Sequence, residues 1–384
     1  MDNKTCKFKS GFSPWVFTTY ACTCACPYCM IPKVQEQAMP PDTFEEMLKI
    51  TEKLFEKGIY DNASFRLSGG EPLLAWDNYA SLVTEYREKY PGQMNFGLLS
   101  NLTVLKDDMI EWMLKNRVGI QASLDDLKGS KILKTGEPSA PIVMENLKRL
   151  KEAKVNFTVN TVYNAEDTRS LDDLVDYICQ LNPSQWGFSA SFTIQDDSYL
   201  EEALAFIKLG ILRLRDNGFD IRNKFRFYNE VINKPGQTCQ AGCGLFAIGP
   251  NLEVWSCQQQ VDKPPLGYFD GNVKELLATS AANAYFRDRV LLPQCTDCSV
   301  LHWCRGGCRA IHESNAKAVD ITCRIKQEIV NYILKNTSDR PPMKPMQKKC
   351  LKDKASLGNM IEVYAGSSEL GEVETPSLGF EAKE

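Results

Sequence analysis

The chain has 384 residues, of which 43% are hydrophobic and 24% are charged, and its formal net charge is −4. This composition is typical of a folded protein of two or three domains, and the charge provides no general attraction to nucleic acid or anionic lipid. The N-terminus lacks the pattern of a secretory signal, and no apolar stretch is long enough to span a membrane. We therefore expect a cytoplasmic protein with no nucleic acid or membrane partner.

Short β-type runs alternate with amphipathic helical patterns in the first half of the chain. The first predicted helix begins at Thr43, which forms a capping box with Glu46, and ends at Gly58. Six strand-and-helix units predict a parallel α/β sheet and, because eight units close a barrel, a partial (β/α)6 barrel with functional groups at the carboxyl ends of the strands. The predicted strands are 15–19, 64–67, 95–99, 118–123, 155–162 and 186–192. The further predicted helices are 77–90, 106–116, 142–153, 171–181 and 198–217.

Changes in composition divide the chain into five parts. We expect an N-terminal arm over residues 1–12, the partial barrel over 13–195 and a bridging helical region over 196–235. Cysteine and glycine become frequent over 236–340, which predicts a small α+β extension that needs bound metal for stability. Residues 341–384 are polar and rich in Gly, Ser and Glu, so we expect a flexible tail.

The side chains most informative about chemistry are the 15 cysteines. Their odd number and a reducing cytoplasm disfavour disulfides, so tightly spaced cysteines are better explained as thiolate ligands of zinc or of iron–sulfur clusters. The two histidines, His302 and His312, lie among the C-terminal cysteines, and we favour a structural role for both. Residues 1–301 contain no histidine, which excludes histidine acid–base chemistry there.

Cys22, Cys26 and Cys29 form a C-x3-C-x2-C motif directly after the first predicted strand. Three thiolates on one loop can hold three corners of a 4Fe–4S cluster and leave the fourth iron open for another ligand. A zinc knuckle is the alternative, but structural zinc takes four protein ligands and no fourth lies nearby. We expect Cys24, inside the motif, to be a bystander.

This motif resembles the signature of the radical S-adenosylmethionine (radical SAM) superfamily. Tyr28 occupies the aromatic position before the third cysteine, and the Gly69–Pro72 segment resembles the family's GGE motif, which binds the methionyl group through its backbone and carboxylate. The Ser123–Asp125 segment resembles the stretch that contacts the ribose and carboxylate of the cofactor, and Ser100-Asn101 stands where relatives often carry Thr-Asn-Gly. The resemblance implies that S-adenosylmethionine is bound by Tyr28, Gly69, Gly70, Glu71, Ser100, Asn101, Ser123 and Asp125.

One position departs from this family pattern. Many relatives place an arginine after the fourth strand to bind the carboxylate of the cofactor, whereas this chain has Lys131 and Lys134 there and no arginine. Either lysine, or a group from elsewhere, is a candidate for that contact.

The C-terminal cysteines resemble the SPASM extension of radical SAM enzymes. Three of them belong to a hairpin whose turn, Pro250-Asn251-Leu252, lacks the usual glycine, so we expect Asn251 to adopt the positive φ. The resemblance implies one auxiliary cluster on Cys239, Cys243, Cys257 and Cys308, and another on Cys295, Cys298, Cys304 and Cys323. Three 4Fe–4S clusters would then be present in all, with two structural zinc sites as the alternative for this region.

The resemblance implies an oxidoreductase that cleaves S-adenosylmethionine reductively to a 5′-deoxyadenosyl radical, which abstracts hydrogen from a residue of a peptide. Neighbouring auxiliary clusters favour net oxidation, so we expect maturation of a ribosomal peptide through a C–C, C–S or C–O cross-link. The alternative in the same class is a formylglycine maturase of the anaerobic sulfatase type, in which an aspartate base typically stands where this chain has Gln258. A non-catalytic electron carrier or zinc scaffold is the alternative from another class. No catalytic base is identified.

The expected partners are a precursor peptide or protein and a one-electron reductant such as flavodoxin or ferredoxin. Because Cys22 comes early in the chain, we expect no leader-binding domain before it. Leader recognition is then expected in the bridging region, in the tail or in a separate leader-binding protein.

Overall fold

The computed structural model describes most of the first 336 residues. All of the described residues belong to one compact unit, residues 8–344. None of their helices is both long and apolar enough to cross a lipid bilayer. The described residues are 11–29, 31, 36–129, 131–163, 171–190, 198–232, 241–242, 244–272, 293–304, 306–308, 310 and 316–336.

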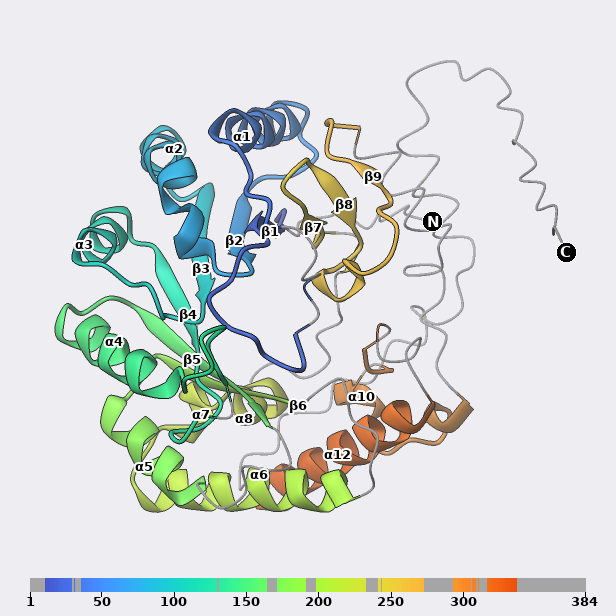
Figure 1. Ribbon diagram of the computed structural model, residues 1–384. Coiled ribbons are helices and arrows are strands. Elements are labelled where there is room, and N and C mark those ends of the chain that lie inside the picture. Colours follow the sequence, from blue (N-terminus) through green and yellow to red (C-terminus); the bar gives the residue numbers. More distant parts are fainter. Residues whose placement is uncertain are drawn as a thin grey trace, which may run out of the picture. The chain divides into compact units, whose positions relative to one another are not determined.

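Six parallel strands in sequence order form the core of a mixed α/β fold (Figure 1). Each strand pairs in parallel with the next, so the carboxyl ends of all six lie at one edge of the sheet. The sheet is open, with β6 at one side, which confirms a partial barrel rather than a closed one. The strands are β1 (Trp15–Thr19), β2 (Ala63–Gly69), β3 (Met94–Ser100), β4 (Gly119–Ser123), β5 (Phe157–Tyr163) and β6 (Gln185–Ala190).

Helices between the strands cover the outer, convex side of the curved sheet (Figure 1). Their apolar faces are buried with the strands in one core, which stabilises the fold mainly through removal of apolar surface from water. The predicted helices are therefore confirmed to within about two residues at most ends. The confirmed helices between the strands are α2 (Trp76–Lys89), α3 (Asp107–Asn116), α4 (Ala140–Glu152) and α5 (Leu171–Leu181), and a short turn that was not predicted, η1 (Pro72–Ala75), precedes α2.

The first helix, α1 (Pro41–Glu56), begins two residues before the predicted Thr43. Pro40 is the extended N-cap and no side chain caps the helix, so the predicted capping box is wrong. Proline suits the first helical position because its fixed φ is already helical and its missing N–H would have no partner there. The predicted end is confirmed, since Gly58 has a φ of 63° just after the C-cap.

A three-stranded addition extends the same sheet beyond β1. β7 (Ala247–Ile248) pairs in parallel with β1, and β8 (Glu253–Trp255) and β9 (Gly267–Tyr268) follow antiparallel. At the β7–β8 turn it is Leu252, with a φ of 65°, and not Asn251 that adopts the left-handed conformation. The Leu252 side chain is buried, which offsets the backbone strain of a residue other than glycine at this position.

Further helices complete the described residues. α6 and α12 pack against each other, and α8 packs on β6. These elements are α6 (Ser198–Asp216), α7 (Ile221–Lys224), α8 (Arg226–Ile232), η3 (Gln258–Gln260), η4 (Pro293–Cys295), α10 (Leu301–Cys304) and α12 (Ala316–Lys335). The predictions for Cys239, Cys243, His312, the arm before residue 11 and the tail after residue 340 concern positions outside the described residues.

Candidate active site

The two glycines after β2 bring that strand against the chain just before Cys22. A Cβ on Gly69, which has a φ of 137°, would lie 2.0 Å from the Thr19 carbonyl oxygen, and one on Gly70 would lie 2.2 Å from the Ala21 oxygen. The Gly70 N–H donates to Thr19 O at 2.8 Å. These contacts require glycine at both positions, because any side chain would push the end of β2 away from the cysteine loop.

The Glu71 carboxylate lies wholly inside the protein, with no exposed surface. It accepts hydrogen bonds from Leu73 N (3.1 Å), Ser100 Oγ (2.7 Å) and Asn101 N (2.7 Å). Burial raises its pKa to about 7, against the effect of these donors. The structure thus differs from the expectation that this carboxylate faces a ligand, because its oxygens join the end of β2 to the end of β3.

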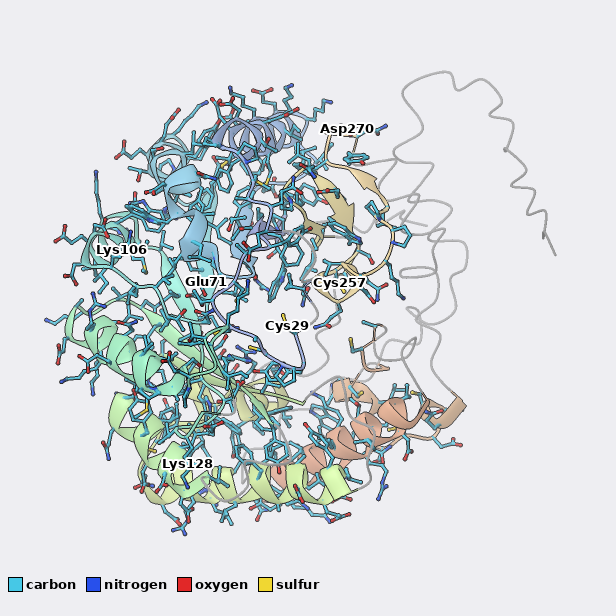
Figure 2. The ribbon with its side chains drawn as sticks, in the orientation of Figure 1. Cys29, Glu71, Lys106, Lys128, Cys257 and Asp270 are labelled. Atoms are coloured by element: carbon cyan, nitrogen blue, oxygen red, sulfur yellow. The ribbon has the colours of Figure 1, made fainter. Side chains whose placement is uncertain are left out.

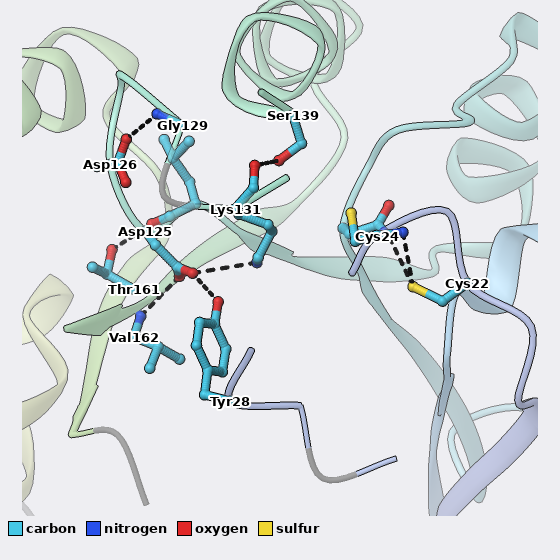
Figure 3. A network of polar contacts seen from close by, with 12 residues as sticks. Cys22, Cys24, Tyr28, Asp125, Asp126, Gly129, Lys131, Ser139, Thr161 and Val162 are labelled. Carbon is cyan, nitrogen blue, oxygen red and sulfur yellow. Dashed lines mark hydrogen bonds and ion pairs between the residues drawn. The ribbon is translucent and has the colours of Figure 1, made fainter. Parts of the chain in front are cut away.

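Asp125, just after β4, is the centre of a second buried network (Figure 3). The Tyr28 hydroxyl donates to Asp125 Oδ2, and the Val162 N–H donates to Oδ1 at 2.9 Å. Lys131 Nζ lies 3.6 Å from Oδ2. Burial, together with the Asp125 charge, raises the pKa of Tyr28 well above its usual value, so this hydroxyl stays protonated as a donor. Ser123 lies half-buried at the end of β4.

The segment after Asp125 folds back and pairs with the cysteine loop. Ala25 N–H donates to Ile132 O at 2.9 Å and Lys134 N–H donates to Thr23 O at 2.8 Å, on either side of an antiparallel bridge between Cys24 and Leu133. This pairing fixes the backbone between Cys22 and Cys26 from outside the motif. It also buries Cys24, whose exposed fraction is 7%.

The electrostatics of the loop favour thiolates at two of the three predicted ligands. Interaction with Cys24 is the largest cause that lowers the pKa values of Cys22 and Cys26, to about 6 and about 7, and the pKa of Cys24 itself is raised. The Cys24 N–H donates to Cys22 Sγ at 3.4 Å. Cys29 is exposed, and its N–H donates to Cys26 O at 3.2 Å. Within the described ranges no three histidine, cysteine or acidic side chains already stand together as a metal site. Two low-pKa thiolates and an accessible third thiol on one loop nevertheless fit a cluster that takes three cysteines.

Three C-terminal cysteines lie within electrostatic reach of a fourth, Cys323. The pKa of Cys323 on α12 is raised to about 11, first by burial and then by Cys304, Cys295 and Cys298. One turn further along α12, Gln327 Nε2 donates to Cys298 Sγ at 3.5 Å. These are the four residues predicted for one auxiliary cluster.

Of the other predicted set, two members are described, Cys257 and Cys308. Cys257 is buried and follows the β7–β8 hairpin, as Figure 2 shows, and Cys308 is half-buried. His302 is half-buried, and its ring lies perpendicular to that of Trp303 with the ring centroids 5.3 Å apart.

Comparison with known proteins identifies the part of the chain that contains the cysteine loop and the networks around Glu71 and Asp125. The family model of the radical SAM superfamily matches residues 16–178. These residues form a radical SAM domain. A relative, a cysteine-type anaerobic sulfatase-maturating enzyme of Clostridium novyi (strain NT), is 22% identical over 326 residues, which cover 77% of this chain and 86% of the relative.

Two solved structures share the fold. Native anSMEcpe with bound AdoMet and a Cp18Cys peptide superposes with a TM-score of 0.71 at 19% identity, over 85% of this chain and 97% of that one. Streptococcus suis SuiB bound to the precursor peptide SuiA gives a TM-score of 0.61 at 15% identity, over 80% of this chain and 74% of that one.

The radical SAM domain contains every residue predicted to contact S-adenosylmethionine and the three cysteines of the N-terminal motif. Its structure also uses residues that sequence reasoning missed, among them Thr23, Thr103 and Leu133. The Asn101-Leu102-Thr103 segment could have predicted the contact between Asn101 and Thr103, because an asparagine side chain often accepts a hydrogen bond from the backbone N–H two residues later. No local pattern indicated the Cys24–Leu133 pairing.

Proposed function

We propose that this protein is a radical SAM maturase that oxidises a side chain of a peptide or protein. The observation that carries the proposal is the cysteine loop. Its Cys22 and Cys26 have lowered thiol pKa values, and it is held between the end of β2 and the segment after Asp125 within residues that match the radical SAM superfamily. A non-catalytic scaffold has no need of this construction at the carboxyl ends of the parallel strands.

The proposed ligands of the first 4Fe–4S cluster are Cys22, Cys26 and Cys29. A cluster bound there would supply the one-electron reduction that splits S-adenosylmethionine into methionine and a 5′-deoxyadenosyl radical. The protein groups proposed to hold S-adenosylmethionine are the backbone at Gly69 and Gly70 and the side chains around Asp125. Of the two candidate lysines, Lys131 supplies a buried positive charge at this position, whereas Lys134 pairs with Glu36 at the surface.

Two further clusters are proposed for the cysteine-rich residues after 236. Cys295, Cys298 and Cys304 each raise the pKa of Cys323, so these three thiols lie near Cys323, which supports one of these clusters. The other, on Cys239, Cys243, Cys257 and Cys308, rests on the resemblance. Anaerobically reconstituted protein should then contain about twelve iron and twelve sulfide per chain. A preparation that is active with zinc and without iron would contradict the cluster assignment.

A peptide substrate is supported by the relatives, because one solved neighbour holds a Cp18Cys peptide and another a precursor peptide. Cross-link formation in a ribosomal peptide is our leading reaction. Gln258, directly after Cys257, has a buried side-chain oxygen that finds no hydrogen-bond partner among the described residues, and an amide does not accept a proton at neutral pH. This residue disfavours a reaction that needs a base there.

Formylglycine formation is the second candidate, favoured by the similarity to the sulfatase-maturating enzyme. Both candidates require a peptide, S-adenosylmethionine and a reductant of the flavodoxin or ferredoxin class. The deciding experiment measures 5′-deoxyadenosine together with the mass of candidate peptides after anaerobic turnover. A cross-linked peptide supports the first candidate and an aldehyde supports the second. Absence of 5′-deoxyadenosine from a protein with full iron content would overturn the proposed function.

A further inference from the structure

We propose that Asn101 is a positioning residue whose side-chain amide donates an N–H···S hydrogen bond to Cys22 and thereby raises the reduction potential of the cluster that Cys22 holds. The inference rests on the proposed function, because it needs a cluster at Cys22. It assigns to this amide a role other than contact with S-adenosylmethionine.

Asn101 stands at the end of β3, where the structure fixes both its backbone and its side chain. Its exposed fraction is 8%, and its backbone N–H is held by Glu71 Oε2 at 2.7 Å. Its Nδ2 lies 3.5 Å from Cys22 Sγ, within the range of a hydrogen bond to sulfur. A buried amide held in this way has little freedom to turn toward another partner.

The direction of the amide follows from the bonds on its other side. Asn101 Oδ1 lies 3.0 Å from the backbone N of Thr103 and 2.7 Å from its hydroxyl. A backbone N–H can only donate, so the atom opposite it must be the amide oxygen, and the amino group must face Cys22 and Thr23.

The amide and two threonine hydroxyls close a ring of hydrogen bonds. Asn101 Nδ2 donates to Thr23 Oγ1 at 3.1 Å, and Thr23 Oγ1 lies 2.5 Å from Thr103 Oγ1, which donates to Asn101 Oδ1. Because the Thr103 hydroxyl donates to the amide, it must accept from Thr23. The ring uses one hydrogen of the amino group and directs the other at the sulfur of Cys22.

A hydrogen bond to a ligand sulfur affects the two oxidation states of a cluster differently. The reduced state places more negative charge on the sulfurs and is therefore stabilised more, which raises the reduction potential. The Cys24 N–H at 3.4 Å from the same sulfur is a second donor, but it belongs to the loop backbone and no side-chain change removes it. Asn101 is thus the donor at Cys22 that a substitution can test.

The test is a redox titration of anaerobically reconstituted full-length protein in the absence of S-adenosylmethionine. Electron paramagnetic resonance monitors the reduction of the cluster during the titration. The relevant signal is the one that is lost in Cys29→Ala and that changes when S-adenosylmethionine is added to the wild type. Asn101→Ala should shift its midpoint potential to a more negative value. Thr103→Val, which opens the ring but keeps the amide, should shift it in the same direction by less, and Thr103→Ser should restore it. Thr51→Val removes a buried hydroxyl bond inside α1 and should leave the potential unchanged.

The outcomes separate this inference from the proposed function. Wild-type protein without any signal sensitive to S-adenosylmethionine would overturn the proposed function itself. A signal present in wild type and in Asn101→Ala at the same potential would overturn the inference alone. Where Asn101→Ala assembles no cluster, Thr103→Val decides: an unchanged potential at wild-type iron content overturns the hydrogen-bond role.

Discussion

Lys131 Nζ lies 3.6 Å from Asp125 Oδ2, and the two side chains are 10% and 1% exposed. Burial alone would lower the pKa of Lys131, but the charges of Asp125 and of nearby thiols offset this, so its pKa lies above the usual value and it remains charged. Asp125 also holds Tyr28 of the cysteine loop. Lys131 is therefore the better of the two candidate lysines for the contact that many relatives are expected to make through an arginine.

The first prediction compares the two lysines of this segment. Lys131→Met leaves the buried Asp125 without its cation, which should cost about 3 kcal/mol of the free energy of unfolding. It should also weaken S-adenosylmethionine binding at least tenfold, since one lost charge contact in a dry site is worth about 1.4 kcal/mol or more. Denaturant unfolding and calorimetric titration with S-adenosylmethionine measure the two effects.

Lys134→Met is the matched control, because Lys134 pairs with Glu36 at 2.7 Å but both side chains are more than half exposed. An exposed pair contributes about 0–1 kcal/mol, and this variant should bind S-adenosylmethionine normally. Equal loss of affinity in both variants would contradict the assignment of Lys131.

The second prediction concerns the buried Glu71 carboxylate. Glu71→Gln places an amino group opposite N–H and O–H groups whose hydrogen bonds the carboxylate now accepts. Loss of at least one of these bonds should destabilise the protein by about 1–3 kcal/mol. Because the folded pKa is about 7 and the ordinary value is 4.5, the folded state binds this proton more tightly than the unfolded state. The contribution of Glu71 to stability is therefore largest at low pH and decreases as the pH rises from about 4.5 to about 7.

Urea unfolding of the iron-free protein at about pH 5 and about pH 8 tests this pH dependence. The wild type should lose more stability between the two values than Glu71→Gln does. The cysteine thiols titrate in both proteins and cancel in the comparison. Parallel pH profiles would show that the carboxylate is ionised throughout.

The sequence predicted the sheet well because strands depend on local patterns. Apolar runs placed all six strands, and the glycines of the Gly69–Pro72 segment indicated a close backbone approach, although the close partner is the Thr19–Ala21 chain. The turn at Leu252 was misassigned because burial of a leucine offset a local preference for asparagine. The Lys131–Asp125 pair and the bridge at Cys24 depend on how irregular segments meet in space, which no local period encodes.

The third prediction separates Cys24 from the proposed ligands. Cys24 is buried in the bridge with Leu133, so Cys24→Ala removes one sulfur from the core, at a cost of about 1 kcal/mol, and should retain the cluster. Cys26→Ala should lose the iron of that cluster and all cleavage of S-adenosylmethionine. Iron analysis and 5′-deoxyadenosine release measure both. Cys179→Ala, a half-buried thiol on α5, is the control for loss of any cysteine. If Cys24→Ala behaves like Cys26→Ala, Cys24 is a ligand and the motif has been misassigned.

The last prediction weighs strain against burial at Leu252. Its φ of 65° costs a residue other than glycine about 1–2 kcal/mol, while its side chain, 8% exposed, contributes about 2–5 kcal/mol of buried packing. Leu252→Gly relieves the strain but loses the packing, so it should be less stable than the wild type. Leu252→Ala loses nearly the same packing and keeps the strain, so it should be the least stable of the three. Thermal unfolding at matched iron content ranks them. A glycine variant more stable than the wild type would show that the leucine side chain contributes less than the turn strain it imposes.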